Sequence, residues 1–153
     1  MKSYRKGVGI FLLNANSDLW VGKRMDFKSD YWQMPQGGID KDESPINAMK
    51  RELMEEVGIS NNYEIIRETS CWLKYKLPKN LLGKIWNGKF IGQTQKWYAC
   101  KFNGKDKEIN LNTHYPEFSD WKWIKPDDSL KLVVPFKKEL YKNILENFKD
   151  LYI

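Results

Sequence analysis

Cysteine and histidine are scarce in this sequence. Its 153 residues include two cysteines, Cys71 and Cys100, and one histidine, His114. The cysteines lie far apart and form no Cys-x-x-Cys pair, so the sequence indicates neither a zinc site nor a disulfide framework. We expect both thiols to be buried, in a protein of a reducing compartment. His114 lies in a polar segment and is assigned no role.

Long apolar runs, internal repeats and low-complexity tracts are absent as well. The apolar run at 8–13 follows three basic residues, but it is short and leads into the polar NANSD without a small-residue cleavage site. No segment approaches the ~20 apolar residues of a membrane span. These absences exclude a membrane protein, and we expect residues 1–153 to form a single cytoplasmic domain.

Aromatic and basic residues are, by contrast, plentiful. The chain has seven Trp, eight Tyr and seven Phe, a net charge of +6 and a pI near 9.2. Hydrophobic residues make up 41% and charged residues 30%, which is typical of a globular domain and not of a disordered one. The basic balance suits a polyanionic partner without identifying it.

Local patterns predict strands alternating with two helices. Segments 7–14 and 19–24 resemble strands joined in a hairpin by a turn, and MDFKSDY (25–31) is a polar loop. In WQMPQGG, which follows, Pro35 and the paired glycines should end regular structure. Further strands are predicted at 64–77, 94–102 and 121–124, with a long irregular loop at 78–93.

The first helix is marked at both ends. Ser44 is a good N-cap, Pro45 suits the first helical position, and Gly58 suits the position after the last turn. Its apolar stripe consists of Ile46, Met49, Leu53 and Val57. A second amphipathic helix starts at Pro135, with the stripe Phe136, Leu140, Ile144, Phe148 and Leu151. The element order predicts a mixed α/β domain, of the α+β type, with helices packed on a sheet.

Three acids crowd the first helix beside its apolar stripe. Glu52, Glu55 and Glu56 fall within about a 100° arc, and like charges four apart cost a helix roughly 0.2–0.5 kcal/mol per pair. They also lie near the C-terminal end, where the helix dipole favours cations. A solvated acidic face would explain the acids alone, but it does not explain the residues that flank them.

Those residues form a spaced pattern from Gly37 to Ile59. Gly37 is followed by Glu43, then Arg51-Glu52-Leu53, Glu55-Glu56 and Gly58-Ile59, nine restricted positions at set spacings. The pattern resembles the Nudix box at every defined position. The resemblance implies a Nudix fold, a mixed sheet between helices with the box as a loop-helix-loop. It also implies hydrolysis of a nucleoside diphosphate linked to another group.

The resemblance further implies a divalent metal cofactor, Mg²⁺ or Mn²⁺, with more than one ion. Glu52, Glu55 and Glu56 are the expected catalytic residues and metal ligands, joined by the carbonyl of Gly37; the general base is left open between Glu52 and Glu55. Clustered carboxylates are the oxygen ligands that hard cations take. Glu43 and Arg51 match a pair that braces the loop against the helix, a structural role.

Segments outside the box resemble bacterial RNA pyrophosphohydrolases and the related dinucleoside polyphosphate hydrolases. They are YRKGVGI (4–10), WQMPQGGID (32–40), WLKYKLP (72–78), IGQTQKWY (91–98), PEFSDWKWI (116–124) and VVPFKKELY (133–141). By position, the resemblance implies that Glu117 would be a further metal ligand. The phosphate contacts would be Arg5, Tyr75, Lys96 and Lys137, and the base contacts would be Arg24, Val134 and Phe136.

The composition of residues 67–107 agrees with a nucleic-acid substrate. This stretch has ten Lys or Arg against two Asp or Glu, interleaved with aromatic residues. Cations for phosphates and rings for bases suit the end of a single-stranded RNA. Alternate residues of strands there should still be core, and Trp97 and Phe102 are expected to be core. Two departures from the subfamily lie near the expected base site, YRKGVG and the length of MDFKSDY.

The leading hypothesis is therefore an RNA 5′ pyrophosphohydrolase that leaves a 5′-monophosphate. One alternative is a diadenosine tetraphosphate hydrolase that gives ATP and AMP, and a hydrolase of the free nucleotide pool would not need so long a basic stretch. A non-enzymatic alternative is a Nudix-fold module that binds nucleotide or RNA without cleaving it. Such modules typically lose box glutamates, and this chain keeps them. No DNA or membrane partner is expected, and protein partners are unknown.

Overall fold

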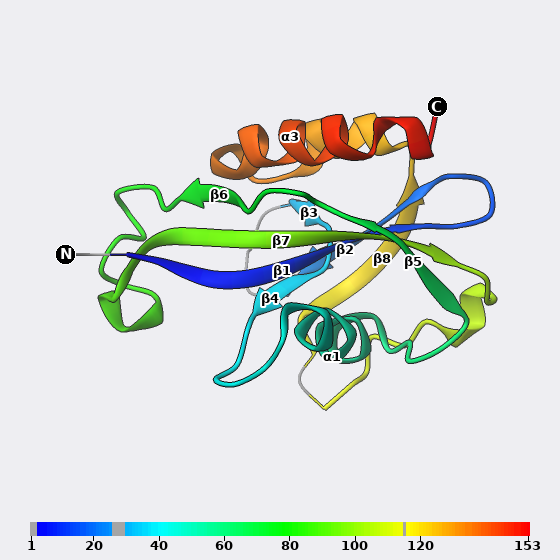
Figure 1. Cartoon of the computed structure of the whole chain (residues 1–153), viewed down its shortest axis with the longest axis horizontal. Coiled ribbons are helices and arrows are strands. Elements are labelled where there is room, and N and C mark those ends of the chain that lie inside the picture. The colour runs from blue at the N-terminus through cyan, green and yellow to red at the C-terminus, as the bar shows by residue number, and fades with distance from the viewer. Residues whose placement is uncertain (1–2, 26–29, 115) are drawn as a thin grey trace.

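A mixed β-sheet lies between helices in the computed structural model, which describes residues 3–25, 30–114 and 116–153 (Figure 1). The strands are β1 (Ser3–Leu13), β2 (Leu19–Arg24), β3 (Trp32–Gln33), β4 (Gln36–Gly38), β5 (Tyr63–Glu68), β6 (Leu73–Lys76), β7 (Phe90–Phe102) and β8 (Phe118–Ile124). The α-helices are α1 (Pro45–Val57), α2 (Ser129–Leu132) and α3 (Lys138–Phe148). This architecture confirms the predicted α+β fold with the box as a loop-helix-loop.

The two longest strands, β1 and β7, pair in parallel at the centre of the sheet. A parallel pair needs a long crossover, and α1 lies on it. The other edge of β1 is shared by β4 and β2, and β2 also pairs with β3 and β8. The other edge of β7 is shared by β5 and β6, both antiparallel. The predicted hairpin is confirmed by the pairing of Leu13 with Leu19.

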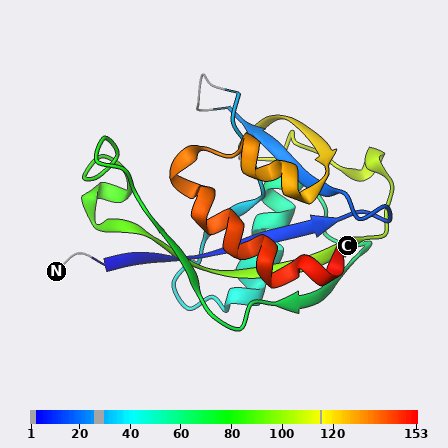
Figure 2. The same ribbon diagram turned by 90° about the horizontal axis from the view of Figure 1, so that it is seen from above.

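Each face of the sheet has its own core, because the side chains of β1 and β7 alternate between the faces. Val8, Ile10 and Leu12 pack on the side of α1, whereas Phe11 and Leu13 pack on the side of α3. Figures 1 and 2 show the two helices on opposite sides of the sheet. Trp97 belongs to the α3 core and Phe102 to the α1 core, so both are core residues as predicted.

Helix α1 begins and ends as the sequence indicates. The Ser44 side chain accepts a hydrogen bond from the Asn47 amide at 3.2 Å, and Gly58 closes the helix with a left-handed φ of 80°. Ile46, however, is 40% exposed, so its place in the apolar stripe was wrong. The buried face of the helix instead consists of Ala48, Met49, Glu52, Leu53, Glu56 and Val57. Two glutamates therefore complete the face that packs on the sheet.

Other boundaries of secondary-structure elements differ from the predictions. For the strands, the reason is that pairing with a neighbouring strand sets where each one begins and ends. The predicted strand at 64–77 is two strands, β5 and β6, separated by residues 69–72. β7 starts at Phe90, inside the predicted loop, because β1 pairs with it along its length. Short strands β3 and β4 flank Pro35 where regular structure was expected to end. The C-terminal helix begins as a 3₁₀ turn at Pro135–Lys137 before α3.

The two cysteines differ in environment. Cys100 lies in the α1 core and is buried as predicted, but Cys71 is exposed, because it lies in the connection between β5 and β6. Within the described residues, no helix has the length and apolar character needed to cross a membrane. Residues 26–29 of the predicted loop MDFKSDY lie outside the described residues.

Candidate active site

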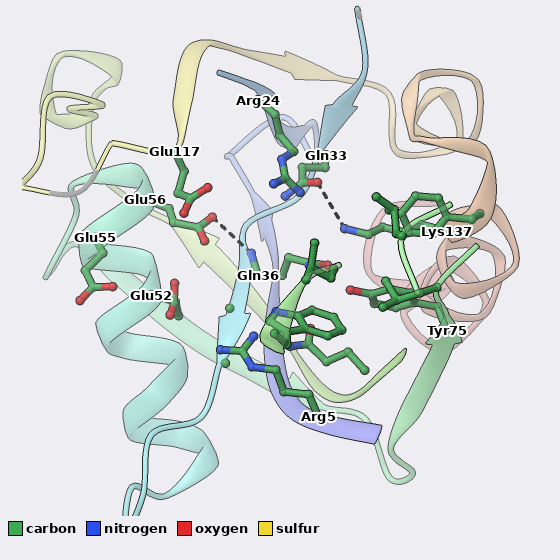
Figure 3. Close-up of a pocket in the computed structure, with 18 residues that line it drawn as sticks. Arg5, Arg24, Gln33, Gln36, Glu52, Glu55, Glu56, Tyr75, Glu117 and Lys137 are labelled. Atoms are coloured by element: carbon green, nitrogen blue, oxygen red, sulfur yellow. Dashed lines mark hydrogen bonds between the residues drawn. The ribbon is translucent and has the colours of Figure 1, made fainter. Parts of the chain in front are cut away.

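A cavity of about 490 Å³ opens where α1, β4, the first residues of β1 and the start of α3 meet. Figure 3 shows glutamates on one side of it and Arg5, Arg24 and Lys137 on the other. The lining residues are Arg5, Arg24, Gln33, Gln36, Gly37, Gly38, Glu52, Glu55, Glu56, Tyr75, Leu77, Leu81, Ile85, Trp86, Gln93, Glu117, Phe136 and Lys137. An acidic wall therefore faces a basic wall across one cavity.

The acidic wall is pressed against the backbone of β4. A Cβ atom added to Gly37 would overlap the carboxyl group of Glu52, so any side chain at this position would displace that carboxyl group. The amide of Gln36 donates to Glu56 Oε2 at 3.3 Å (Figure 3). The box glycine and two box glutamates thus lie close together, and Gly37 lines the same cavity.

Two of the three box glutamates are buried, although they carry acid groups. Glu52 is 8% exposed and Glu56 is 5% exposed. Burial raises the pKa of Glu52, and it raises the pKa of Glu56 well above its ordinary value, with the charges of Glu52 and Glu117 adding to the effect. Without a cation, this pair of carboxyl groups retains a proton more readily than carboxyl groups in water.

Arg51 joins the box loop to the helix. Its Nε donates to Glu43 Oε2 at 2.9 Å and its Nη2 donates to the Gly38 carbonyl at 2.8 Å. The hydrogen bond to Glu43 raises the pKa of Arg51, and the same bond lowers the pKa of Glu43. Arg51 Nη1 also donates to Glu52 at 2.8 Å and Glu55 at 3.2 Å. The arginine therefore makes the expected bracing contacts and also orients two acids.

The basic wall contains a buried lysine. Lys137 is 2% exposed, its Nζ donates to Gln33 Oε1 at 3.4 Å, and it lies 5.2 Å from the centre of the Tyr75 ring. Arg5 lies with its guanidinium 5.3 Å from the centre of the Trp86 ring. A buried ammonium and a guanidinium at one cavity wall provide an anion site.

A row of glutamines under the cavity was missed by reasoning from the sequence. Gln95 Nε2 donates to Gln93 Oε1 at 2.6 Å and to Gln36 Oε1 at 3.2 Å, and the Trp97 indole donates to Gln95 Oε1 at 2.8 Å. The signal that could have revealed it is the period-two polar pair in GQTQKW, since a strand side chain that faces a core is seldom polar without partners.

The structure brings most of the predicted site residues together, but not Lys96 or Val134. Glu117, Arg24, Tyr75 and Phe136 all line the cavity, whereas Lys96 does not, because it pairs in register with Val8 and shares its face of the sheet. Gln93 and Trp97 face the other way. Val134 packs at the margin of the α3 core. Neither residue is among those that line this cavity.

The donor set of the acidic wall fits a divalent cation. Carboxylates of Glu52, Glu55, Glu56 and Glu117 and the carbonyl of Gly37 are all oxygen donors, which Mg²⁺ and Mn²⁺ prefer. A bound cation would stabilise the ionised form of these buried carboxyl groups and so offset the cost of their burial. Across residues 3–25, 30–114 and 116–153, no three acid, histidine or cysteine side chains are already gathered as ligands. Arg51 engages Glu52 and Glu55 instead.

The sequence and the fold both have known relatives. RNA pyrophosphohydrolases of Rickettsia typhi and Rickettsia bellii are 46% identical over 148 residues, 97% of this chain and 91% of theirs. The Escherichia coli dihydroneopterin triphosphate pyrophosphohydrolase superposes with a TM-score of 0.70 at 17% identity, over 95% of this chain and 99% of its own. The Caenorhabditis elegans Ap4A hydrolase gives 0.65 at 17% identity, over 94% and 98%.

The family match covers nearly the same span. The NUDIX domain matches residues 3–144, which include the whole sheet and most of α3. Hydrolases with this domain generally use divalent metal ions. The box pattern, the loop-helix-loop that carries it and the relatives agree, and this chain belongs to the NUDIX family of hydrolases.

Proposed function

We propose that this protein is an RNA pyrophosphohydrolase, which hydrolyses the 5′ polyphosphate of RNA and leaves a 5′-monophosphate. The observation that carries the proposal is the cavity itself, in which buried glutamates face the buried Lys137 and Arg5. A polyphosphate is the ligand that needs both walls, since it binds cations directly and carboxylates only through a metal. The relatives named RNA pyrophosphohydrolase support the same substrate.

The reaction needs one water molecule and moves one proton. Water adds to one phosphorus of the anhydride between the α and β phosphates, and the bond from that phosphorus to the bridging oxygen breaks. RNA monophosphate and pyrophosphate then separate. The proton lost by water passes to a carboxylate, and Glu52, which lines the cavity, is one candidate to accept it. Glu55 lines the same cavity and is the other candidate base.

The chain's own groups bind and orient the substrate. Glu52, Glu55 and Glu56, with Glu117 and the Gly37 carbonyl, would hold Mg²⁺ or Mn²⁺, in more than one site. When bound, such ions neutralise phosphate charge and lower the pKa of water. Arg5 and Lys137 donate to phosphate oxygens from the opposite wall, next to Tyr75. Arg24 and Phe136 flank the first base.

A dinucleoside polyphosphate is the second candidate substrate. Apolar groups line the cavity in two places, Phe136 near Lys137 and Trp86 near Arg5, and a molecule with a base at each end of its phosphates could use both. A binding module without activity is less well supported. All three box glutamates are present and line the cavity, and a module that only bound phosphate would have no use for them.

Product analysis tests the proposal. With Mg²⁺, wild-type protein is expected to convert triphosphorylated RNA into RNA that a 5′-monophosphate-dependent exonuclease degrades, with release of pyrophosphate. The same RNA with a 5′-hydroxyl end is the control and should remain resistant. If the RNA end stayed triphosphorylated while diadenosine tetraphosphate was split, the second candidate would replace the first. A single domain over residues 1–153 and a cytoplasmic location stay predictions.

A further inference from the structure

A second basic surface lies on the α1 side of the sheet, opposite the side on which Arg5, Tyr75 and Gln93 line the cavity. It consists of Tyr4, Lys6, Trp72, Lys74, Lys76 and Lys96, from β1, β7 and the segment that contains β6. We call it the lysine face. None of its six residues lines the cavity.

Strand register places these side chains side by side. Tyr4 and Lys76 both pair with Gly92 of β7, and Lys6 and Lys74 both pair with Thr94. Residues paired in register point to the same side of a sheet, and so do residues two apart in a strand. Lys96 follows Thr94 by two positions in β7. Trp72 lies just before β6, and its ring is on the same side because Lys6 Nζ lies 6.0 Å from the ring centre. All six side chains therefore leave the sheet on one side.

In the part of the chain that the structure describes, no helix covers this part of the sheet. α1 packs against β1 and β4, and α3 packs against β6 from the cavity side. Figures 1 and 2 show β6 and the N-terminal end of β1 extending past the end of α1. Accordingly Lys6, Lys74 and Lys76 are exposed, and Trp72 is 39% exposed although it is large and apolar.

The lysine face combines cations with aromatic rings. Lys6 Nζ lies 6.0 Å from the centre of the Trp72 ring, and Lys74 Nζ lies 5.0 Å from that of Tyr4. Among the described residues, one acid forms an ion pair with these lysines, Glu68 at 4.0 Å from Lys96. Four cations on one strand surface, with one exposed and one half-buried ring, match the two needs of single-stranded nucleic acid, phosphate contacts and stacking.

The lysine face is also continuous with the cavity through its own strands. Arg5 lines the cavity and lies between Tyr4 and Lys6, and Tyr75 lines it between Lys74 and Lys76. The two surfaces are thus the two sides of the same strand segments. A chain whose first phosphates lie at Arg5 and Tyr75 needs only to pass round these segments to reach the lysines.

We propose that the lysine face binds the body of the RNA substrate, several nucleotides downstream of the 5′ end. The inference rests on the proposed function and extends it to substrate length, since a dinucleotide would not reach this surface. In this proposal Lys96 contacts a phosphate of the RNA outside the cavity. A protein with an acidic surface carries the same negative charge as RNA and is the alternative ligand of the lysine face. The experiment below distinguishes the two ligands.

The test measures kcat/KM of one variant and of the wild type on a long and on a short RNA substrate. Lys6→Gln, Lys74→Gln and Lys76→Gln are combined, which removes three charges and keeps side-chain length. On a triphosphorylated RNA of about 16 nucleotides, within the length that one binding domain covers, kcat/KM is expected to fall about tenfold or more at low salt. On a triphosphorylated trinucleotide it should stay within about twofold of wild type.

Binding supplies a readout that is independent of catalysis. The variant should bind a 5′-hydroxyl RNA of the same length more weakly, with a salt slope smaller by about two in log–log form, because each phosphate contact on a single strand contributes about 0.7. The matched control combines Lys125→Gln, Lys131→Gln and Lys142→Gln, three lysines in ion pairs on other surfaces, and should change neither assay.

The outcomes distinguish the two proposals. If kcat/KM on long RNA and RNA binding were both unchanged, the proposal that the lysine face binds RNA would be overturned. The same result is expected if the ligand of this face is an acidic protein. Equal losses on long and short RNA would also overturn it, because the lysines would then act through the fold or the cavity. If wild type released no pyrophosphate from RNA but the variant still lost RNA binding, the lysine face would stand and the proposed function would fail.

Discussion

Glu52→Gln is expected to lower kcat on triphosphorylated RNA by about 10³-fold or more, while the protein stays folded and binds RNA. Glutamine has the shape of glutamate, so it fits the space against Gly37 and keeps an oxygen for Arg51 Nη1. It lacks the charge that a metal ligand or a general base needs. The loss should therefore fall on kcat and not on the Kd for RNA.

Two controls make this result specific to the acidic wall. Glu146→Gln, on the exposed side of α3, changes a glutamate outside the cavity and should leave kcat unchanged. Thermal unfolding of Glu52→Gln without metal should give a Tm no lower than wild type, because a buried charge has been removed. Turnover equal to wild type in Glu52→Gln would contradict the assignment of this residue to the metal site.

Glu56→Gln is expected to stabilise the metal-free protein near neutral pH, by about 1–3 kcal/mol. Glu56 is buried, and burial together with the charges of Glu52 and Glu117 raises its pKa well above the ordinary value. Glutamine cannot ionise, and its oxygen can still accept the hydrogen bond from the Gln36 amide. For a chain of this length the Tm should rise by about 2–4 °C for each kcal/mol.

The pH dependence of that difference has a defined sign. A carboxyl group whose pKa is raised on folding binds its proton more tightly in the folded state, so it favours folding at low pH. Its cost to the wild type begins as pH rises through the ordinary pKa of glutamate and is complete above the raised pKa of the folded state. The two proteins should therefore have similar Tm values at pH 4 and diverge as pH increases.

Metal addition should reverse the order of the two proteins. Mg²⁺ binds the folded state, so it should raise the Tm of the wild type more than that of Glu56→Gln, which lacks one ligand. Glu139→Gln, a change at an exposed site on α3, controls for net charge. If the Tm of the wild type depended neither on pH above 5 nor on Mg²⁺, the buried acidic pair would not cost stability, and a cation would not offset such a cost.

Sequence alone was sufficient for the parts of the site that are local. The start and end of α1 follow from Ser44, Pro45 and Gly58, whose roles depend on neighbours within a few positions. The grouping of the box glutamates follows from their spacing along that helix. Gly37 could be assigned to the same site because only a short loop separates it from the helix. Local spacing carries this information because a helix repeats every 3.6 residues.

The remaining parts depend on contacts between distant segments. Lys96 was expected to contact phosphates together with Arg5, Tyr75 and Lys137. Its pairing with Val8, however, places it on the other side of the sheet, and a shift of the register by one residue would have reversed that side. The glutamines at 36, 93 and 95 meet only because β4 and β7 both pair with β1. The burial of Glu52 and Glu56 likewise depends on β4 lying against α1, which the helix sequence does not encode.

The preference of the enzyme for RNA 5′ ends is measured by comparing kcat/KM for two substrates in one buffer. Triphosphorylated RNA and diadenosine tetraphosphate are compared with wild-type protein at one Mg²⁺ and one salt concentration. RNA is expected to be favoured by about tenfold or more, which corresponds to about 1.4 kcal/mol of transition-state stabilisation. An advantage of that size for diadenosine tetraphosphate would contradict the account.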